Sequence, residues 1–320
     1  MSKVVHLVLT GGVGSRVWPL SRKSKPKQYL DIFSGNSLFE NTIIRNKSLS
    51  DQLIIVGNVD NIQLSEKSLQ KLEIKNAVNI IEAAPRNTAA AIAFAAFACN
   101  SDDILVVTPS DHVIMGEELY SQSVQQAIEK AQKGAIVTFG IKPVKPETGY
   151  GYIEFKEDRV LSFREKPNLE TAESFLKKGN FYWNSGMFCF KAGVFLSELK
   201  KYEPELFSLS KLVWDKNVDG NLDLETSLLI PSISVDYAVM ERSKKIKVVS
   251  SSFDWSDLGS FESIYEYLIK IGHSIDENGN MVIGTNIFTS FVGVKNCIFV
   301  FTNDAFLVLQ KEKSQDVKKV

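Results

Sequence analysis

The segment VVHLVLTGGVGSRVWPLSRKSKPKQ, residues 4–28, decides the fold of this chain. It begins with a mainly apolar run, Val4 to Leu9, of the kind that forms a buried strand in a parallel sheet. The run ends at Thr10-Gly11-Gly12, which predicts a turn with an exposed backbone directly after the strand. The N-terminal region is therefore expected to be a strand that leads into a glycine-rich turn.

A cluster of cations follows this turn. Its members are Arg16, Arg22, Lys23, Lys25 and Lys27. Open backbone N–H groups next to Lys and Arg side chains form a site that can bind a triphosphate. The spacing lacks the GxxxxGK[ST] of a Walker loop, and Val17 stands where G-x-G-x-x-G needs its third glycine. A tight turn surrounded by solvated lysines is the structural alternative.

The rest of the chain alternates strand-like and helix-like segments. We predict strands at 51–57, 79–82, 104–108 and 136–140, and helices at 88–99 and 121–133. This alternation indicates a mainly parallel sheet with helices on both faces. The second half is mixed, with paired strands at 149–155 and 160–164, further strands at 181–190 and 246–249, and helices at 169–178, 192–202 and 261–271. From about residue 278, short glycine-punctuated β runs without a helix predict a small β appendage, so we divide the chain into 1–277 and 278–320.

The composition excludes several functional classes. The chain has 320 residues, 44% hydrophobic and 23% charged, with a net charge of −1. This balance is typical of a globular protein and argues against a nucleic-acid partner. Three scattered cysteines without a CxxC pair argue against a zinc ribbon or a disulfide framework, and they fit a reducing, cytoplasmic location. No signal peptide or membrane span is predicted.

Two aspartates adjoin predicted elements in the two halves of the chain. Asp111 follows the strand at 104–108 within PSDH, and Asp257 precedes the helix at 261–271 within WSDLGS. The carboxyl end of a parallel strand is where open α/β sheets bind ligands, although an Asx turn and a helix cap are the alternatives. Carboxylates about 4 Å apart repel by about 4 kcal/mol at an effective dielectric near about 20, so we expect a cation between them if they meet.

Other polar residues adjoin the predicted elements. Glu165 and Lys166 follow the strand predicted at 160–164, and they can accept hydroxyl hydrogen bonds and bind an anion, respectively, although an exposed ion pair is the alternative. Asn184 offers an amide beside small residues. The segment 86–88 opens the helix predicted at 88–99, where capping would also explain it. We expect His112 to be a structural hydrogen-bonding residue.

The segment 10–28 resembles the signature of the sugar-phosphate nucleotidyltransferases, GGxGxRxxPL…PKQ. Trp18 before Pro19, and Gln28 after Lys27, are similar to the mannose-1-phosphate guanylyltransferases. Further blocks of that family follow in order: PRNT (85–88), PSDH (109–112), PETGYGYI (146–153), REKP (164–167), WNSGMF (183–188), VDYAVME (235–241) and WSDLGSF (255–261). The departures, at Ser15, Val17 and Ala90, remove no charge.

The resemblance implies an α/β, Rossmann-like, mainly parallel mixed sheet flanked by helices, with an appendage that begins a left-handed β-helix-like region. It implies that Arg16, Lys27 and Asp111 are catalytic, and that Asp111 and Asp257 hold Mg²⁺. The nucleotide-binding residues that it implies are Gly11, Gly12, Gly14, Ser15, Arg16, Lys27, Pro85, Arg86, Asn87, Thr88, Ser110 and Asp111. The implied sugar-phosphate-binding residues are Gly149, Tyr150, Glu165, Lys166, Asn184 and Asp257.

The reaction implied by the resemblance joins GTP and mannose 1-phosphate to give GDP-mannose and pyrophosphate, in a homodimer. A thymidylyl- or uridylyltransferase acting on glucose 1-phosphate is the nearest rival. A silent regulatory subunit and a dehydrogenase are rivals from other classes. The dehydrogenase alternative is disfavoured, because this sequence lacks the third glycine of the dinucleotide-binding motif and an acidic residue near Gly57. Because the sequence ends at Val320, we expect no isomerase domain of the kind that some larger relatives carry.

Overall fold

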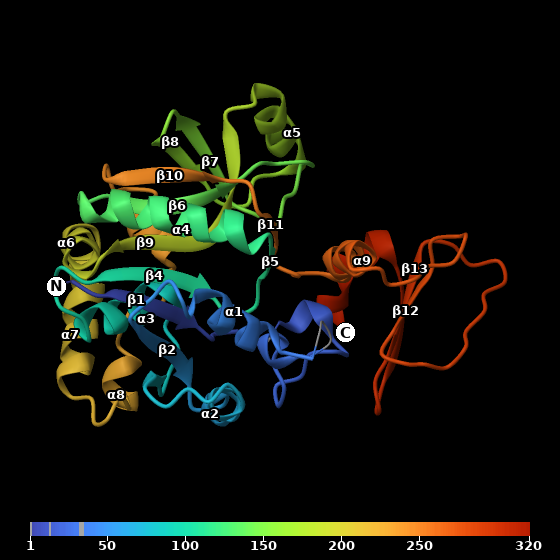
Figure 1. Ribbon diagram of the computed structural model, residues 1–320, viewed down its shortest axis with the longest axis horizontal. Coiled ribbons are helices and arrows are strands. Elements are labelled where there is room, and N and C mark those ends of the chain that lie inside the picture. Colours follow the sequence, from blue (N-terminus) through green and yellow to red (C-terminus); the bar gives the residue numbers. More distant parts are fainter. Residues whose placement is uncertain (1, 13, 32–34) are drawn as a thin grey trace.

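The computed structural model describes residues 2–12, 14–31 and 35–320. Its centre is a nine-stranded sheet in the order β3-β2-β1-β4-β9-β6-β10-β8-β7 (Figure 1). The strands are β1 (Val4–Leu9), β2 (Gln52–Asn58), β3 (Val78–Glu82), β4 (Ile104–Pro109), β6 (Ile136–Ile141), β7 (Tyr152–Lys156), β8 (Arg159–Arg164), β9 (Phe181–Lys191) and β10 (Ile246–Ser251). The predicted mixed α/β class is confirmed.

The four strands β3, β2, β1 and β4 are parallel, so their carboxyl ends lie along one edge of the sheet. Strand β9 runs antiparallel to β4 and to β6, and its first residues also pair with β7. Strand β9 therefore connects the parallel half of the sheet to the half that carries β6, β7, β8 and β10. As a result, the loops after β1, β3 and β4 lie at the edge where α/β sheets bind ligands.

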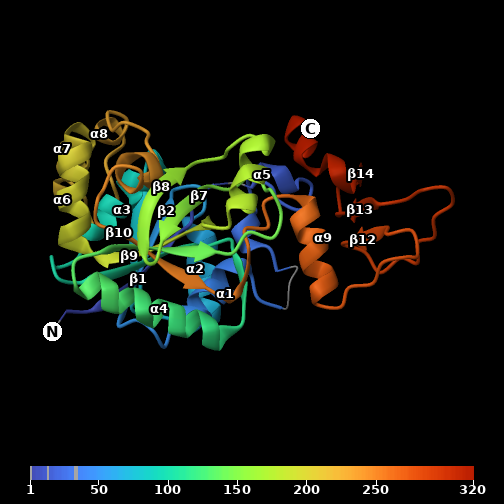
Figure 2. The ribbon, with the colours of Figure 1, turned by 90° about the horizontal axis from the view of Figure 1, so that it is seen from above.

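Helices cover both faces of the sheet (Figures 1 and 2). Core residues of α3 (Asn87–Phe97), α6 (Ala192–Tyr202) and α7 (Pro204–Asp215) pack with Val5 and Leu7 of β1. On the opposite face, α4 (Glu117–Gln132) packs against Val106 and Val137, while α1 (Leu38–Asn46) and α2 (Ile62–Lys71) pack near Val8. Since neighbouring residues of β1 point to opposite faces, its nearly continuous apolar sequence is explained by burial on both sides.

A two-stranded ribbon, β5 (Val113–Met115) with β11 (Asp254–Ser256), joins distant parts of the chain. The strands are antiparallel, with Trp255 opposite Ile114 and Ser256 opposite Val113. Asp111 and His112 immediately precede β5, and Asp257 immediately follows β11. The ribbon therefore brings the PSDH and WSDLGS motifs side by side.

The C-terminal region forms a small sheet of β12 (Met281–Ile283), β13 (Cys297–Phe301) and β14 (Phe306–Gln310), beyond α9 (Phe261–Lys270) in Figure 1. The prediction that this region lacks helix is wrong, because a 3-10 helix spans Lys311–Lys319. Its Val317 packs with Val17, next to the glycine-rich loop. Val317 is the one apolar residue of this very polar helix, so the sequence shows no apolar periodicity by which the helix could be predicted. No helix in the described part of the chain has the length and apolar character needed to cross a membrane.

Candidate active site

The glycine-rich loop after β1 is held open by side chains from the same signature. Gly12 and Gly14 have positive φ angles of 94° and 70°, a region that favours glycine. Gln28 Nε2 donates to the carbonyl oxygens of Thr10 at 2.8 Å and Gly12 at 3.3 Å. A Cβ atom on Gly14 would lie 2.6 Å from Cβ of Lys27, so only glycine permits this approach. Val13 lies outside the described residues.

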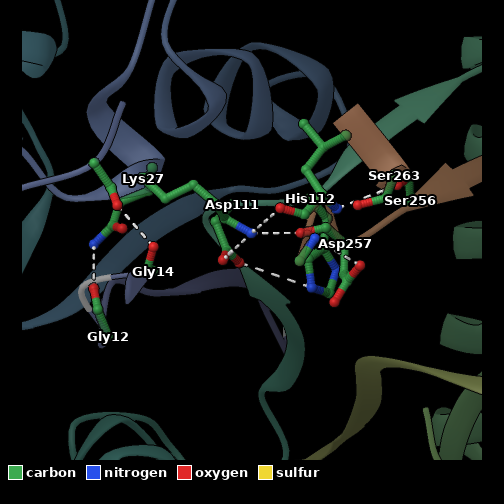
Figure 3. A network of polar contacts seen from close by, with 12 residues as sticks. Gly12, Gly14, Lys27, Asp111, His112, Ser256, Asp257 and Ser263 are labelled. Carbon is green, nitrogen blue, oxygen red and sulfur yellow. Dashed lines mark hydrogen bonds and ion pairs between the residues drawn. The ribbon is translucent and has the colours of Figure 1, made fainter. Parts of the chain in front are cut away.

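Lys27 is the centre of the site (Figure 3). Its side chain is only 7% exposed, and its Nζ lies 2.7 Å from Oδ2 of Asp111. The same Nζ donates to the carbonyl oxygen of Asp257. Burial alone would raise the pKa of Asp111, but the Lys27 ammonium and His112 hold that pKa below the usual carboxyl range. Lys27 Nζ therefore links the two segments through the carboxylate of Asp111 and the backbone carbonyl of Asp257.

The carboxylate of Asp257 is oriented by its own neighbours. Oδ1 accepts hydrogen bonds from the Tyr150 hydroxyl and from the Gly259 amide, both at 2.9 Å. The guanidinium of Arg16 also lies beside Gly259: a Cβ atom added to Gly259 would be 3.0 Å from Nη2 of Arg16. The cap of α9 is Ser260, whose side chain accepts from Ser263 N. Asp257 is therefore not the cap of that helix, which leaves it available for ligand chemistry.

A second polar cluster lies at β9. Asn184 donates through Nδ2 to Oδ1 of Asp236 at 3.0 Å. Gly151 separates it from Glu165: a Cβ atom on Gly151 would meet Oε2 of Glu165 at 2.4 Å and Cβ of Asn184 at 3.4 Å. Lys166 pairs with Glu165 at 3.1 Å and is mostly exposed. Asn184, Glu165 and Asp236 thus present amide and carboxylate groups that suit a polyhydroxyl ligand.

Sequence reasoning did not single out Asp236, although it lies in the VDYAVME block. Burial, and then the charge of Glu165, raise the pKa of Asp236 to about 6. A buried acid beside another acid is a common feature of functional sites. The sequence signal was a carboxylate within an otherwise apolar segment.

The predicted nucleotide segment at the start of α3 is anchored to the chain that precedes the turn at 236–240. Arg86 Nε donates to the carbonyl oxygen of Ile230 at 2.6 Å, and Thr88 Oγ1 accepts from Val235 N at 2.9 Å. Asn87 has a positive φ of 70°. Its side-chain Oδ1 accepts a hydrogen bond from Thr88 N at 2.8 Å, although the N-cap residue, Arg86, makes no side-chain cap bond of its own. Arg86 and Thr88 therefore have a structural role whatever they bind.

Glu82 is a further residue that sequence reasoning missed. It ends β3 and is 6% exposed, and its Oε1 has no hydrogen-bond partner within residues 2–12, 14–31 and 35–320. Burial raises the pKa of Glu82 to about 7, although the backbone amide of Arg86 lowers it. An unpartnered buried carboxyl group is costly. Its position at the ligand edge of the sheet suggests that a ligand completes its hydrogen bonds.

A cavity of about 690 Å³ adjoins the Asp257 side of the site. Four predicted site residues line it: Arg16, Gly149, Tyr150 and Asp257. It continues along aromatic residues of β9 and along α5 (Leu169–Lys178) and α9. Lys27, Asp111, Glu165 and Asn184 are not part of its lining. The polar groups described above therefore extend beyond this cavity.

The donor set of Asp111 and Asp257 fits a Mg²⁺ ion. Oδ1 of Asp111 lies 3.7 Å from Nε2 of His112, and Oδ2 of Asp257 accepts no hydrogen bond from the residues that the structure describes. Both are hard carboxylate oxygens, which Mg²⁺ prefers. Mg²⁺ is commonly held by one or two carboxylates together with substrate phosphates and water. Asp111 and Asp257 therefore offer the kind of donor atom that such an ion takes from a protein.

Comparison with known proteins shows the family of this chain. Residues 5–273 match the nucleotidyl transferase family, and residues 273–320 match a MannoseP isomerase/GMP-like beta-helix domain. The mannose-1-phosphate guanylyltransferase RfbM of Salmonella typhimurium is 40% identical over 98% of this chain and 71% of its own length. A mannose-1-phosphate guanylyltransferase of Escherichia coli is 39% identical over 100% of this chain and 73% of its own length. A solved structure described as a mannose-1-phosphate geranyltransferase, from Thermus thermophilus, has a TM-score of 0.86 and 26% identity, covering 99% of this chain and 98% of its own.

Proposed function

The chain belongs to the nucleotidyl transferase family, among the mannose-1-phosphate guanylyltransferases, and from this premise we propose that it transfers GMP from GTP to α-D-mannose 1-phosphate. The products are GDP-mannose and pyrophosphate. The observation that carries the proposal is the convergence of Lys27, Asp111 and Asp257 beside the glycine-rich loop. This arrangement supplies the cation and the carboxylates that transfer between two anionic substrates requires.

In the proposed reaction a phosphate oxygen of mannose 1-phosphate attacks the α-phosphorus of GTP. The bond from that phosphorus to the oxygen bridging to the β-phosphate breaks, and pyrophosphate leaves from the opposite side. No proton has to be removed, so the work of the protein is alignment and charge neutralisation. Arg16 and Lys27 bind the triphosphate, and Glu165, Asn184 and Lys166 bind the sugar phosphate. A silent regulatory subunit is disfavoured because these groups are all present.

A Mg²⁺ ion held by Asp111 and Asp257 would neutralise charge on the phosphate oxygens. The Lys27 ammonium pairs with Asp111, so both groups can face the same phosphate oxygens. The stem of Lys27 is buried and Gly14 contacts it closely, which leaves only the end of the side chain for the triphosphate.

Pyrophosphate release from a panel of nucleoside triphosphates, crossed with hexose 1-phosphates, tests the proposal. We expect GTP with mannose 1-phosphate to be turned over fastest, in the presence of Mg²⁺. Faster turnover of dTTP or UTP with glucose 1-phosphate would assign the chain to another branch of the family. No turnover with any pair would favour the silent subunit.

We further propose that Glu82 reads the guanine base, since guanine offers two adjacent donors, N1–H and the 2-amino group, to one carboxylate. Glu82→Gln is expected to lower kcat/KM for GTP by about 10–100-fold, because a hydrogen bond to a charged group contributes about 1.5–3 kcal/mol. ATP lacks this donor pair, so its weak turnover should change little. Steady-state kinetics with both nucleotides measure the ratio, and an unchanged GTP-to-ATP ratio would remove Glu82 from the base site.

The same variant has a second, ligand-independent signature. Folding raises the pKa of Glu82 from 4.5 to about 7, so its favourable contribution is complete below about pH 4.5 and is lost as the pH rises through about 7. Glu82→Gln should therefore be more stable than the wild type at pH 8, by about 3 kcal/mol, and similar at pH 4.5. Urea unfolding at the two pH values measures this difference. Equal differences at both pH values would show that folding does not shift the pKa of Glu82.

We propose that the β appendage begins at about residue 278. We also propose that its exposed apolar residues form the contact between the two copies of the chain in a homodimer. Ile287, Phe288 and Val292 are 71%, 91% and 95% exposed, and such clusters mark interaction sites. Replacing Phe288 and Val292 together by Asp should convert a dimer to a monomer in sedimentation velocity. Val218→Asp, at a position 69% exposed on another surface, is the matched control and should remain dimeric. A wild type that sediments as a monomer would contradict the proposal.

We propose a cytoplasmic location, which is consistent with Cys99, Cys189 and Cys297 being free thiols. Unpaired cysteines are typical of proteins that work in a reducing compartment. Burial raises the pKa of the Cys99 thiol to about 11, which keeps it unreactive.

A further inference from the structure

We propose that Trp255 is a positioning residue that orients both Asp111 and Asp257, acting through His112 and Tyr150. The inference rests on the proposed function, because it assumes that these two carboxylates serve the reaction. Trp255 is the first residue of the WSDLGS motif and lies on β11, opposite Ile114 of β5. Its indole contacts both residues that in turn face the carboxylates.

The first connection runs through His112. The indole Nε1 of Trp255 donates to Nδ1 of His112 at 3.2 Å, with the two rings almost perpendicular at 88°. An indole N–H can only donate, so Nδ1 must carry a lone pair. The imidazole proton is then on Nε2, the atom that lies 3.7 Å from Oδ1 of Asp111. Trp255 thereby makes His112 present an N–H group to Asp111.

The second connection runs through Tyr150. The Tyr150 ring packs edge-on against Trp255, with centroids 5.0 Å apart, and its hydroxyl donates to Oδ1 of Asp257 at 2.9 Å. Trp183 packs against another side of Tyr150 at 5.2 Å. The phenol is thus held between two indoles while its hydroxyl points at the carboxylate. A shift of Trp255 would release Tyr150 and His112 together.

Trp255→Phe tests the proposal, since it keeps an aromatic ring but removes the donor. The chain has only three histidines, so the ¹⁵N imidazole signals of His112 can be assigned by comparison with His112→Asn. In the metal-free wild type we expect the Nε2–H tautomer. In Trp255→Phe we expect a mixture of both tautomers at the same pH, together with Mn²⁺ affinity that is about 10-fold weaker in the presence of GTP.

Trp183→Phe is the matched control, because Trp183 contacts Tyr150 but is not hydrogen-bonded to His112. Its His112 signals should be those of the wild type. If Trp255→Phe does not fold, Tyr150→Phe keeps the proposal testable. It removes only the bond to Asp257, so it should weaken Mn²⁺ binding and leave the His112 tautomer unchanged.

Unchanged His112 signals in a folded Trp255→Phe protein would overturn the proposal, as would unchanged Mn²⁺ affinity in both variants. These outcomes are distinct from failure of the proposed function. The tautomer is read without substrate or metal, whereas the function fails if wild-type protein makes no GDP-mannose, or if Mn²⁺ binding survives removal of Asp111 and Asp257.

Discussion

Asp111→Asn is expected to reduce GDP-mannose formation by about 10³-fold, equivalent to about 4 kcal/mol of transition-state stabilisation. The substitution preserves size and removes the charge that the proposed Mg²⁺ needs. Asp257→Asn should have a similar effect, because both carboxylates serve the same ion. Initial rates of pyrophosphate release at saturating Mg²⁺ measure the loss. Asp102→Asn, which changes an aspartate 77% exposed in a surface ion pair, should be fully active.

The two variants should differ in stability. Asp111→Asn leaves the buried Lys27 ammonium without its carboxylate partner, so we expect the ligand-free protein to lose about 2 kcal/mol of unfolding free energy. That value is below the cost for a fully buried pair, since Asp111 is 32% exposed. Asp257→Asn leaves no cation unpaired and should be nearly as stable as the wild type. Rates close to wild type in either variant would exclude that residue from the metal site.

Lys27→Ala is expected to lower the rate by about 10²–10³-fold, the usual cost of losing a preorganised charge contact in the transition state. Lys27→Met should lose as much activity, although it keeps the buried stem against Gly14. Agreement between the two variants therefore assigns the loss to the ammonium group rather than to packing. The rate is followed by pyrophosphate release, with circular dichroism to verify folding.

Lys25→Ala is the control for this experiment. Lys25 belongs to the same cationic cluster, but its side chain is 50% exposed and pairs with the exposed carboxylate of Asp31. We expect its activity to stay within about twofold of wild type, because exposed ion pairs contribute little. Equal losses in Lys25→Ala and Lys27→Ala would mean that the cluster acts through its summed charge and that Lys27 has no specific role.

The spacing of apolar residues, and the turn residues between apolar runs, were enough to predict most of the sheet. The strand at Val4–Leu9 and the helices Leu169–Lys178 and Ala192–Tyr202 have the predicted bounds. Apolar spacing marks all three, and Asn168 and Gly179 also mark the ends of the first helix. The helix at Pro204–Asp215 was missed. Its start lies directly after another helix, so no loop separates the two patterns.

Parts of the site could not be predicted from sequence. Strands β5 and β11 span only three residues each, too few for an alternation pattern to be visible. The Lys27–Asp111 pair and the burial of Glu82 depend on contacts between distant segments. Sequence reasoning therefore predicted that Asp111 and Asp257 share a site, but it could not show that Lys27 pairs with Asp111.

The β5–β11 ribbon also affects the order in which the molecule is assembled. The hydrogen bond between His112, which precedes β5, and Trp255 of β11 joins residues that are 143 positions apart. Contacts between such distant segments form slowly, because the chain must first lose the conformational entropy of the loop between them. Strands β1 to β4 need only residues up to 109 and can pair earlier during synthesis. Catalytic competence would then be the last property that the folding chain acquires. A nucleotide that binds only the closed ribbon would stabilise this final step by mass action.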